Sequence, residues 1–335
     1  MTVIVTGGAG FIGSNLIRGL NARGVTDIWV IDNLGTSLKF KNLIGCTFKQ
    51  YLQKDRFREL IRENRFDNEV SAIFHQGACS NTMELDGNYM IDNNYQYSVE
   101  LLDFATEKQI PFIYASSAAV YGANTEFKED GVNESPLNVY GYSKLIFDEL
   151  VRSRLGHAKS QIVGLRYFNV YGPREGHKGQ MASVSYHLST QMLEGGALKL
   201  FEGSGGYAAG EQRRDFIYVD DVVNVNLDFL DNPDRSGIYN CGTGQSQTFN
   251  EVAVATINSV RAKYGNQTLT LEQMLSEEIV TYRPFPEGLE SRYQSFTEAD
   301  LEALKASGSD VRFHDVESGV NAYVDFLFQS NFFKS

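Results

Sequence analysis

The clearest candidates for chemistry are a tyrosine and a lysine at the start of a predicted helix. Residues 140–144 read Y-G-Y-S-K, so Tyr140 and Lys144 share one face of that helix. A free tyrosine titrates at about pH 10, and a neighbouring ammonium lowers that pKa by stabilising the phenolate. Such a phenol can take a proton from a substrate hydroxyl while hydride leaves the same carbon. The pair therefore predicts alcohol oxidation or reduction with a nicotinamide cofactor.

A serine pair lies upstream of that helix. Residues 115–122 read A-S-S-A-A-V-Y-G and end a run that predicts a buried strand. Ligands of open parallel sheets bind at the carboxyl ends of strands, so one of these hydroxyls can hydrogen-bond the reacting oxygen. Ser117 is our candidate for this hydroxyl and Ser116 is its rival, because spacing barely separates them.

The Tyr–Lys pair has an alternative interpretation. By itself, a tyrosine followed four residues later by a lysine also occurs on ordinary surface helices.

A glycine-rich turn near the N-terminus gives the pair a context. Residues 3–13 read V-I-V-T-G-G-A-G-F-I-G, in which Gly7, Gly10 and Gly13 are evenly spaced. The turn follows an apolar run and opens a helical pattern, and glycine lets the backbone approach a pyrophosphate without a Cβ in the way. The helix N-terminus then offers N–H donors to the phosphates. The pattern predicts a dinucleotide site.

Asp32 ends the second predicted strand, where a dinucleotide-binding fold places an acidic residue on the adenosine ribose. Taken alone, its carboxylate favours NAD, because it would repel the 2′-phosphate of NADP. Asn33 follows it, and Lys39 and Lys54 come shortly after. A lysine near that ribose would offset the repulsion, although an arbitrary lysine is more often a solvated surface charge. These residues leave the choice between NAD and NADP open.

Two further segments are candidates for the cofactor site. The third strand ends in F-H-Q-G-A-C-S (74–80), where the small residues Gly77 and Ala78 permit close backbone approach to the adenosine-phosphate part. Asn93, in D-N-N-Y, can hydrogen-bond near the ribose, or it can be an ordinary asparagine of a turn or helix surface.

Short apolar runs alternate with helical patterns through the first half of the chain. This alternation predicts a parallel sheet with helices on both faces, an α/β fold of the Rossmann-type doubly wound class. We expect a dinucleotide-binding domain over 1–168, with returning segments near 216–240, and a smaller, interleaved mixed α/β substrate domain over 169–335. The predicted strands are 3–6, 28–32, 72–75, 112–116 and 162–167, with 216–219 and 238–241 returning to the main sheet. In the second half we expect loops over 195–211 and helices over 249–264, 298–307 and 316–328, with Thr248 and Thr297 as N-caps.

Composition argues against several classes of protein. The 335 residues carry a formal net charge of −12, whereas a nucleic-acid binder usually has the opposite sign. No apolar run is long enough to predict a membrane span, and no signal peptide precedes the first strand, so we expect a cytoplasmic protein. Three widely separated cysteines, Cys46, Cys79 and Cys241, are typical of reduced thiols. No metal-ligand spacing is present, so we expect no metal.

The glycine spacing and the Tyr–Lys pair resemble the short-chain dehydrogenase/reductase superfamily, and T-G-G-A-G-F-I-G resembles its extended branch, which acts largely on nucleotide-sugars. Residues 166–183 read R-Y-F-N-V-Y-G-P-R-E-G-H-K-G-Q-M-A-S. The end of this segment, together with 92–98, 137–144, 200–204, 213–216 and 292–297, resembles the family of ADP-L-glycero-D-manno-heptose 6-epimerases. That resemblance runs through nearly the whole chain. It implies an isomerase that epimerises C6 of ADP-bound heptose for the lipopolysaccharide inner core, with one tightly bound NADP per subunit and a homopentamer.

The resemblance also implies ligand contacts, position by position. The serine that precedes A-x-V-Y-G in the family points to Ser117. Gln180 is a departure, since the family often has serine there, and the segment 205–212 is longer than expected, so Arg213 rivals Arg214. The implied cofactor contacts, beyond the three glycines and the Tyr–Lys pair, are Phe11, Ile12, Asp32, Asn33, Lys39, Lys54, Gln76, Gly77, Ala78, Cys79, Ser80, Asn93, Val170 and Lys178. The implied substrate contacts are Ser117, Asn169, Gln180, His187, Phe201, Glu202, Gly203, Ser204, Arg214 and Tyr293.

Lys178 is implied to be a second acid/base, and a physical reason supports this role. Epimerisation requires hydride to leave one face of a carbon and return to the other. When the ketone-like intermediate presents its opposite face, its oxygen moves, so one fixed tyrosine cannot serve both epimers equally well. Without the resemblance, Lys178 reads as a solvent-exposed loop lysine or a phosphate contact.

Three other functions compete with this interpretation. Another nucleotide-sugar epimerase, such as a UDP-sugar 4-epimerase, shares the glycine turn and the Tyr–Lys pair. A 4,6-dehydratase is disfavoured, because the resembling dehydratases carry Asp-Glu where this chain has Ala118 and Ala119. A non-catalytic NADP-binding sensor on the same fold would commonly lack the tyrosine or the lysine, and this chain has both.

Overall fold

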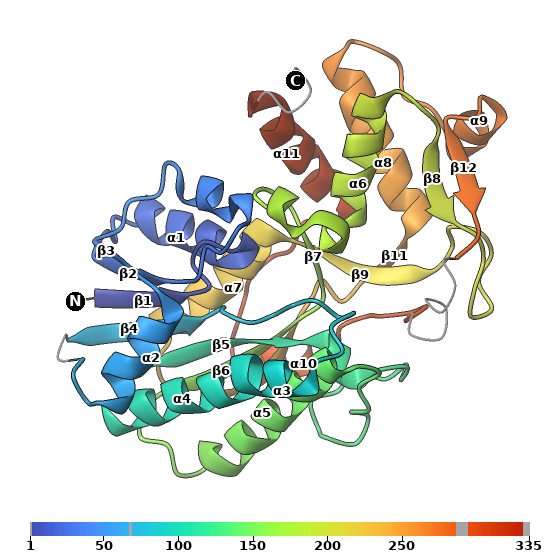
Figure 1. Ribbon diagram of the computed structural model, residues 1–335. Coiled ribbons are helices and arrows are strands. Elements are labelled where there is room, and N and C mark those ends of the chain that lie inside the picture. Colours follow the sequence, from blue (N-terminus) through green and yellow to red (C-terminus); the bar gives the residue numbers. More distant parts are fainter. Residues whose placement is uncertain (1, 67–68, 286–293, 331–335) are drawn as a thin grey trace. The chain divides into compact units, whose positions relative to one another are not determined.

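A sheet of seven parallel strands organises the first part of the chain (Figure 1). In this computed structural model, which describes residues 2–66, 69–285 and 294–330, the strand order is β10-β6-β5-β4-β1-β2-β3. Every neighbouring pair is parallel, and burial on both faces explains the continuous apolar runs in the sequence. The strands are β1 (Thr2–Thr6), β2 (Ile28–Ile31), β3 (Gln50–Leu52), β4 (Val70–His75), β5 (Phe112–Ser117), β6 (Ile162–Tyr167) and β10 (Gly237–Cys241).

Helices cover both faces of this sheet (Figure 1). α1 and α7 lie on one face and touch so closely that a Cβ on Gly19 would lie 2.5 Å from the Val223 side chain. α2, α4 and α5 lie on the other face and share an apolar core with the strands. These helices are α1 (Phe11–Ala22), α2 (Lys54–Arg62), α4 (Tyr97–Glu107), α5 (Val139–Leu155) and α7 (Val219–Asp231). Shorter elements are η1 (Leu38–Leu43), α3 (Gly87–Met90), η2 (Ile91–Gln96), η3 (Ala118–Tyr121) and α10 (Glu302–Ala306).

The order of the strands reverses at β1, which has β2 on one side and β4 on the other. In doubly wound sheets the ligand binds at such a point, outside the carboxyl ends of the strands. Here the turns after β1 and β4 come together, because a Cβ on Gly7 would lie 2.7 Å from the backbone of Gly77. The fold therefore directs the glycine turn to the expected ligand edge.

The chain forms two compact units. The first comprises Met1–Tyr167, Val222–Cys241 and Asp300–Val311, and the second comprises Phe168–Asp221, Gly242–Ala299 and Arg312–Ser335. The second unit contains a sheet of order β11-β9-β7 and a parallel pair of β12 and β8. Its elements are β7 (Asn169–Tyr171), η4 (Gly176–Met181), α6 (Val184–Glu194), β8 (Leu198–Phe201), β9 (Arg213–Tyr218), β11 (Ser246–Thr248), α8 (Phe249–Lys263), α9 (Leu271–Ser276), β12 (Val280–Arg283) and α11 (Val316–Gln329).

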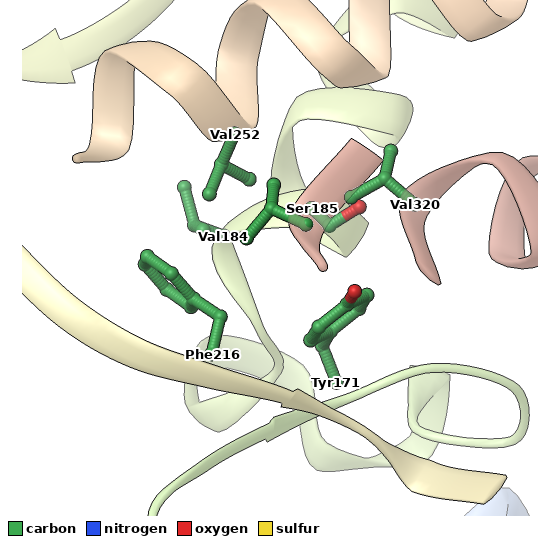
Figure 2. Close-up of a pocket in the computed structure, with 7 residues that line it drawn as sticks. Tyr171, Val184, Ser185, Phe216, Val252 and Val320 are labelled. Carbon is green, nitrogen blue, oxygen red and sulfur yellow. The ribbon is translucent and has the colours of Figure 1, made fainter. Parts of the chain in front are cut away.

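The core of the second unit lies where β7, β9, α6, α8 and α11 converge. The space between the side chains at this point is too small to admit a water molecule (Figure 2). A ligand pocket needs a volume of roughly 300 Å³ or more. The lining residues are Tyr171, Val184, Ser185, Phe216, Val252, Val316 and Val320. These side chains are therefore part of the packed core of the second unit and do not form a substrate site.

The Rossmann-type architecture and the strands at 3–6, 28–32, 72–75, 112–116, 162–167 and 238–241 are confirmed. Three local predictions are wrong. The strand predicted at 216–219 belongs to β9, which pairs with β7 and β11 and not with the main sheet. Thr297 caps no helix, since α10 begins at Glu302, and its hydroxyl instead accepts the backbone N–H of Asp215 at 3.2 Å. The predicted loop at 195–211 contains β8.

Two features are absent from the described parts of the chain. Within 2–66, 69–285 and 294–330, no helix is long and apolar enough to cross a membrane. In the same ranges, no group of three or more histidine, cysteine, aspartate or glutamate side chains is arranged to hold a metal ion.

Candidate active site

The turn between β1 and α1 requires glycine. Gly7 has φ of 64°, in the left-handed region that residues with a Cβ rarely adopt. A Cβ on Gly13 would lie 2.3 Å from the carbonyl oxygen of Gly7, so the helix packs directly on the turn. Gly10 precedes α1 without a capping side chain, and Phe11 and Ile12 form the start of the helix. The first N–H groups of α1 are therefore not capped by a side chain of Gly10, and a glycine backbone leads up to them. This arrangement is suited to binding a pyrophosphate.

Asp32 is buried at the end of β2 and holds three partners. Its carboxylate accepts the backbone N–H groups of Ala9 at 2.9 Å and Asn33 at 2.7 Å. The Nζ of Lys39 lies 2.6 Å from the same carboxylate, forming an ion pair. The acidic residue expected at the ribose is therefore fixed in place, and its negative charge is offset by one of the two predicted lysines.

The second lysine joins the same group of residues. The Nζ of Lys54 donates to Asn93 Oδ1 at 2.9 Å, and its backbone N–H donates to Asn33 Oδ1 at 3.0 Å. Asn93 lies in η2, a π-helical segment, and such segments frequently mark functional sites. Hydrogen bonds and an ion pair thus join five residues that were predicted from separate segments of the sequence: Asp32, Asn33, Lys39, Lys54 and Asn93.

Asn94 is a residue of this site that the sequence analysis missed. It lies beside Asn93 and is almost wholly buried. Its side chain accepts the backbone N–H of Cys79 at 2.8 Å and donates to the carbonyl of Cys79 at 3.0 Å and to Ser143 Oγ at 3.1 Å. Asn94 therefore ties the loop after β4, which carries Gln76, Gly77, Ala78, Cys79 and Ser80, to the helix of the catalytic pair. The only signal in the sequence was the repeated asparagine of D-N-N-Y.

His75, at the end of β4, forms hydrogen bonds that hold neighbouring elements of the site together. Its Nδ1 lies 2.6 Å from Thr6 Oγ1, and its Nε2 lies 2.8 Å from Ser98 Oγ. Ser98 donates its proton to the carbonyl of Asn94, so it must accept one from His75 Nε2, and Thr6 then donates to Nδ1. Burial and the charge of Lys144 lower the pKa of His75, in agreement with a neutral ring. His75 is thus a structural link between β1 and α4.

Ser117 and Tyr140 meet at the end of β5. Asn138 caps α5 through the backbone N–H of Gly141, and a Cβ on Gly141 would lie 2.7 Å from the carbonyl oxygen of Ala119. The first turn of α5 therefore packs on the turn that follows Ser117. A hydrogen bond with the Ser117 side chain lowers the pKa of Tyr140, but burial has the larger effect and raises it above the ordinary value.

Lys144 lies on the next turn of α5 and is only 5% exposed. Its Nζ donates to the carbonyl oxygen of Ala115 in β5 at 2.7 Å. Burial lowers the pKa of Lys144 to about 8, while the nearby carboxylate of Asp148 opposes that change. The lowering of the Tyr140 pKa by a neighbouring ammonium stays a prediction from the sequence.

The structure distinguishes the two serines. Ser116 donates to the buried carboxylate of Asp148 at 2.8 Å, whereas Ser117 hydrogen-bonds Tyr140. Asp148 also accepts from Tyr114 at 2.8 Å and from Arg166 Nε at 2.9 Å. Ser116 therefore belongs to the packing of β5 against α5, and Ser117 is the hydroxyl beside the phenol.

Lys178 lies in η4, in the second unit. Its backbone N–H donates to the carbonyl of Glu175 at 2.9 Å, and its side chain is half-buried. Gly179, which follows it, has φ of 55°, a conformation that favours glycine and turns the chain directly after the lysine. Burial lowers the pKa of Lys178, and the charge of Glu175 opposes that change.

The structure places the other predicted substrate residues within the second unit, with one exception. His187 Nε2 lies 3.3 Å from the carbonyl oxygen of Gln180, so these two come together. Asn169 and Val170 lie on β7, while Phe201 ends β8 and precedes the turn of Glu202, Gly203 and Ser204. Arg213 bonds Ser246, and Arg214 lies buried against Phe249, which leaves both as candidates. Tyr293 lies outside the described residues.

A phenol, a hydroxyl and an ammonium stand at the sheet edge that also carries the glycine turn. This combination is suited to moving hydride between a substrate alcohol and a bound dinucleotide, so fold and site define a Rossmann-type dinucleotide-dependent enzyme. A family model described as NAD dependent epimerase/dehydratase family matches residues 3–242, and the chain belongs to that family.

Similarity to particular proteins extends over the whole length. The chain is 54% identical over 98% of its residues, and 98% of the other protein, to an ADP-L-glycero-D-manno-heptose-6-epimerase from Thiobacillus denitrificans. A crystal structure of the Helicobacter pylori protein of that name matches with a TM-score of 0.76 and 33% identity, covering 98% of this chain and 96% of that one. A UDP-glucose 4-epimerase from Thermus thermophilus in complex with NAD matches with a TM-score of 0.73 and 26% identity, covering 97% and 98%.

Proposed function

We propose that this protein is an isomerase that inverts C6 of a nucleotide-linked heptose, converting ADP-D-glycero-D-manno-heptose to ADP-L-glycero-D-manno-heptose for the lipopolysaccharide inner core. The observation that carries the proposal is the grouping of Ser117, Tyr140 and Lys144 in a chain 54% identical to an ADP-L-glycero-D-manno-heptose-6-epimerase. The net reaction consumes no oxidant, because the hydride that leaves C6 returns to it.

In the oxidation step, Tyr140 takes the proton of the C6 hydroxyl as hydride departs from C6. Ser117 holds the same oxygen through its hydroxyl. The dinucleotide, when bound, supplies the hydride acceptor and a positive charge that opposes the effect of burial on the pKa of Tyr140. Lys144 lies one turn along α5 from the phenol and bonds the end of β5, and we assign it the nicotinamide ribose as its ligand.

In the return step, a second proton donor must serve the other epimer, and we assign that role to Lys178. Burial brings the pKa of Lys178 down toward the working range, which suits a group that both accepts and donates a proton. Tyr140 and Lys178 then exchange roles when the reaction runs in the opposite direction. We further assign Asn169, Gln180, His187, Arg214 and the turn 201–204 to the binding of the nucleotide-sugar.

We propose NADP as the cofactor. Asp32 alone would repel a 2′-phosphate, but Lys39 lies 2.6 Å from its carboxylate and offsets the charge. Lys54 reaches Asn93 in the same group and adds a second positive charge. Release of the bound nucleotide from purified protein should yield NADP, and Lys39→Ala should lose affinity for NADP more than for NAD. Co-purification of NAD, with equal losses in the variant, would contradict this assignment.

The function is tested by incubating the protein with ADP-D-glycero-D-manno-heptose and, separately, with UDP-glucose, and following C6 or C4 inversion by NMR. We expect inversion only of the heptose. Tyr140→Phe should abolish it, whereas Tyr142→Phe, a half-exposed tyrosine of the same helix, should keep it. Turnover of UDP-glucose alone would identify a UDP-sugar 4-epimerase, and nucleotide binding without turnover of either sugar would favour a sensor.

We also propose a homopentamer in the cytoplasm, on the family resemblance. Light scattering should then report the mass of five chains of 37.5 kDa, and the activity should fractionate with cytoplasmic enzymes. A monomeric mass or activity confined to the membrane fraction would contradict these assignments.

A further inference from the structure

Glu175 is a fully buried carboxylate in the loop that carries Lys178. Its Oε1 accepts the backbone N–H of Gly172 at 3.1 Å and the hydroxyl of Ser183 at 2.7 Å. Its Oε2 accepts the backbone N–H of Ser183 at 2.5 Å. A single side chain thus bonds both ends of the loop 172–183.

The contacts around Glu175 show what this arrangement holds in place. Ser183 is also the N-cap of α6, where its Oγ accepts the backbone N–H of Tyr186, so the loop is anchored to a helix at one end. Tyr323 of α11 contributes a further hydrogen bond to the carboxylate. Lys178 follows Glu175 by one turn of η4 and lies between the two anchored ends.

The same carboxylate acts on the charge of the lysine. Burial disfavours the ammonium of Lys178 and lowers its pKa, and Glu175 opposes this. Among the described residues, Tyr186 of α6 and Tyr323 of α11 also face Glu175. Burial raises the pKa of both phenols, and the negative charge of Glu175 raises it further. Both phenols are therefore neutral at working pH, and Glu175 is the acidic residue nearest to Lys178 in the sequence.

We propose that Glu175 is a positioning residue for Lys178: its buried carboxylate closes the 172–183 loop and places a negative charge one turn of η4 from the lysine. The functional meaning of this inference rests on the proposed role of Lys178 as second acid/base. The two parts are measurable without turnover, because one concerns the charge of an amine and the other the rigidity of a loop.

The charge is tested with Glu175→Gln, which keeps the shape of the side chain and removes its charge. The pH dependence of acetylation of Lys178, read by peptide mass spectrometry, should move to lower pH in the variant. Exposed Lys199 of β8, in the same unit, serves as the internal control and should keep its profile. An unchanged profile of Lys178 in the folded variant would overturn the inference.

The loop is tested with Ser183→Ala, which also covers the case in which Glu175→Gln does not fold. This variant removes the hydroxyl's hydrogen bond to the carboxylate, together with the N-cap bond to the backbone N–H of Tyr186, and keeps the charge of Glu175. Ser183→Thr, which retains a hydroxyl for both bonds, is its matched control. Amides 176–182 should exchange about tenfold faster in the alanine variant, as expected for loss of a hydrogen bond to a charged group. Equal exchange rates in the alanine and threonine variants would contradict the inference that Glu175 closes the 172–183 loop.

Activity then separates this inference from the proposed function. Glu175→Gln should lower kcat more than it raises KM, and should shift the pH profile of kcat in the same direction as the acetylation profile. If Lys178→Met retains full epimerase activity, the assigned role of Lys178 fails, and the functional half of the inference falls with it. A shift in acetylation without any change in the pH profile of kcat would likewise refute a role for Glu175 in turnover.

Discussion

Replacement of Lys144 by methionine should make the dinucleotide-free protein more stable while removing its activity. Lys144 is 5% exposed, and burial lowers its pKa from 10.5 to about 8. At about 1.36 kcal/mol per pH unit, the buried ammonium therefore costs about 3 kcal/mol at pH 7 relative to its state in water. Methionine keeps the length of the apolar stem and removes the charge.

The expected gain is smaller than that cost, because the variant also loses the hydrogen bond to the carbonyl of Ala115. An unsatisfied buried acceptor costs about 1 to 3 kcal/mol, so we expect Lys144→Met to gain about 0 to 2 kcal/mol at pH 7. Turnover should fall at least about hundredfold, since the variant loses the ammonium that we assign to the nicotinamide ribose.

The pH dependence gives the sharper test, in urea unfolding of wild type and variant between pH 6 and pH 11. The folded-state pKa of Lys144 lies below its unfolded value, so the unfolded wild type binds the extra proton between about 8 and 10.5. Wild-type stability should therefore rise by about 3 kcal/mol across that window relative to the variant, so the advantage of the variant should disappear and the wild type should be the more stable protein at pH 11. A variant less stable than wild type at pH 7, or a gap that does not change with pH, would refute the reasoning.

Three other outcomes follow from the geometry. Ser117→Ala should lower kcat about hundredfold, whereas Ser116→Ala should keep kcat and lower stability by about 1 to 3 kcal/mol, in steady-state kinetics and urea unfolding; the reverse pattern would exchange their roles. Gly13→Ala should abolish nucleotide binding in a fluorescence titration, because the new Cβ would lie 2.3 Å from the carbonyl oxygen of Gly7; unchanged affinity would remove the turn from the site. Burial raises the pKa of Glu129 to about 7, so stability from its protonated form is present below about pH 4.5 and lost as pH rises through 7. Glu129→Gln should therefore raise the melting temperature at pH 8 and leave it unchanged at pH 4, and a change of equal size at both pH values would disprove the assignment.

The sequence could predict the parts of the site that depend on local pattern. The glycine turn is readable because Gly7 and Gly13 serve the geometry of one strand-to-helix connection, only a few residues long. Tyr140 and Lys144 are readable because helical spacing places them on one face. In each case the residues that matter are neighbours in the chain.

The sequence could not predict the contacts that join distant segments. The strand at 216–219 was expected in the main sheet, because buried apolar residues look the same whichever sheet they join, and β9 pairs with β7 and β11 instead. Asn94 and Asp148 lie in no recognisable sequence motif. Their importance comes from hydrogen bonds to distant segments, to the loop after β4 for Asn94 and to β5 for Asp148. Ser116 and Ser117 differ only in the direction that each side chain takes from the strand.

The central claim is that hydride leaves C6 of the sugar and returns to the same carbon. Substrate labelled with deuterium at C6 tests this most directly, with the product examined by NMR and mass spectrometry after complete epimerisation in ordinary water. The account predicts that the product has inverted C6 configuration and retains the deuterium, without accumulation of reduced nicotinamide. Loss of the label to water would indicate proton abstraction from carbon, and stoichiometric reduced cofactor would indicate a dehydrogenase; either result would contradict the account.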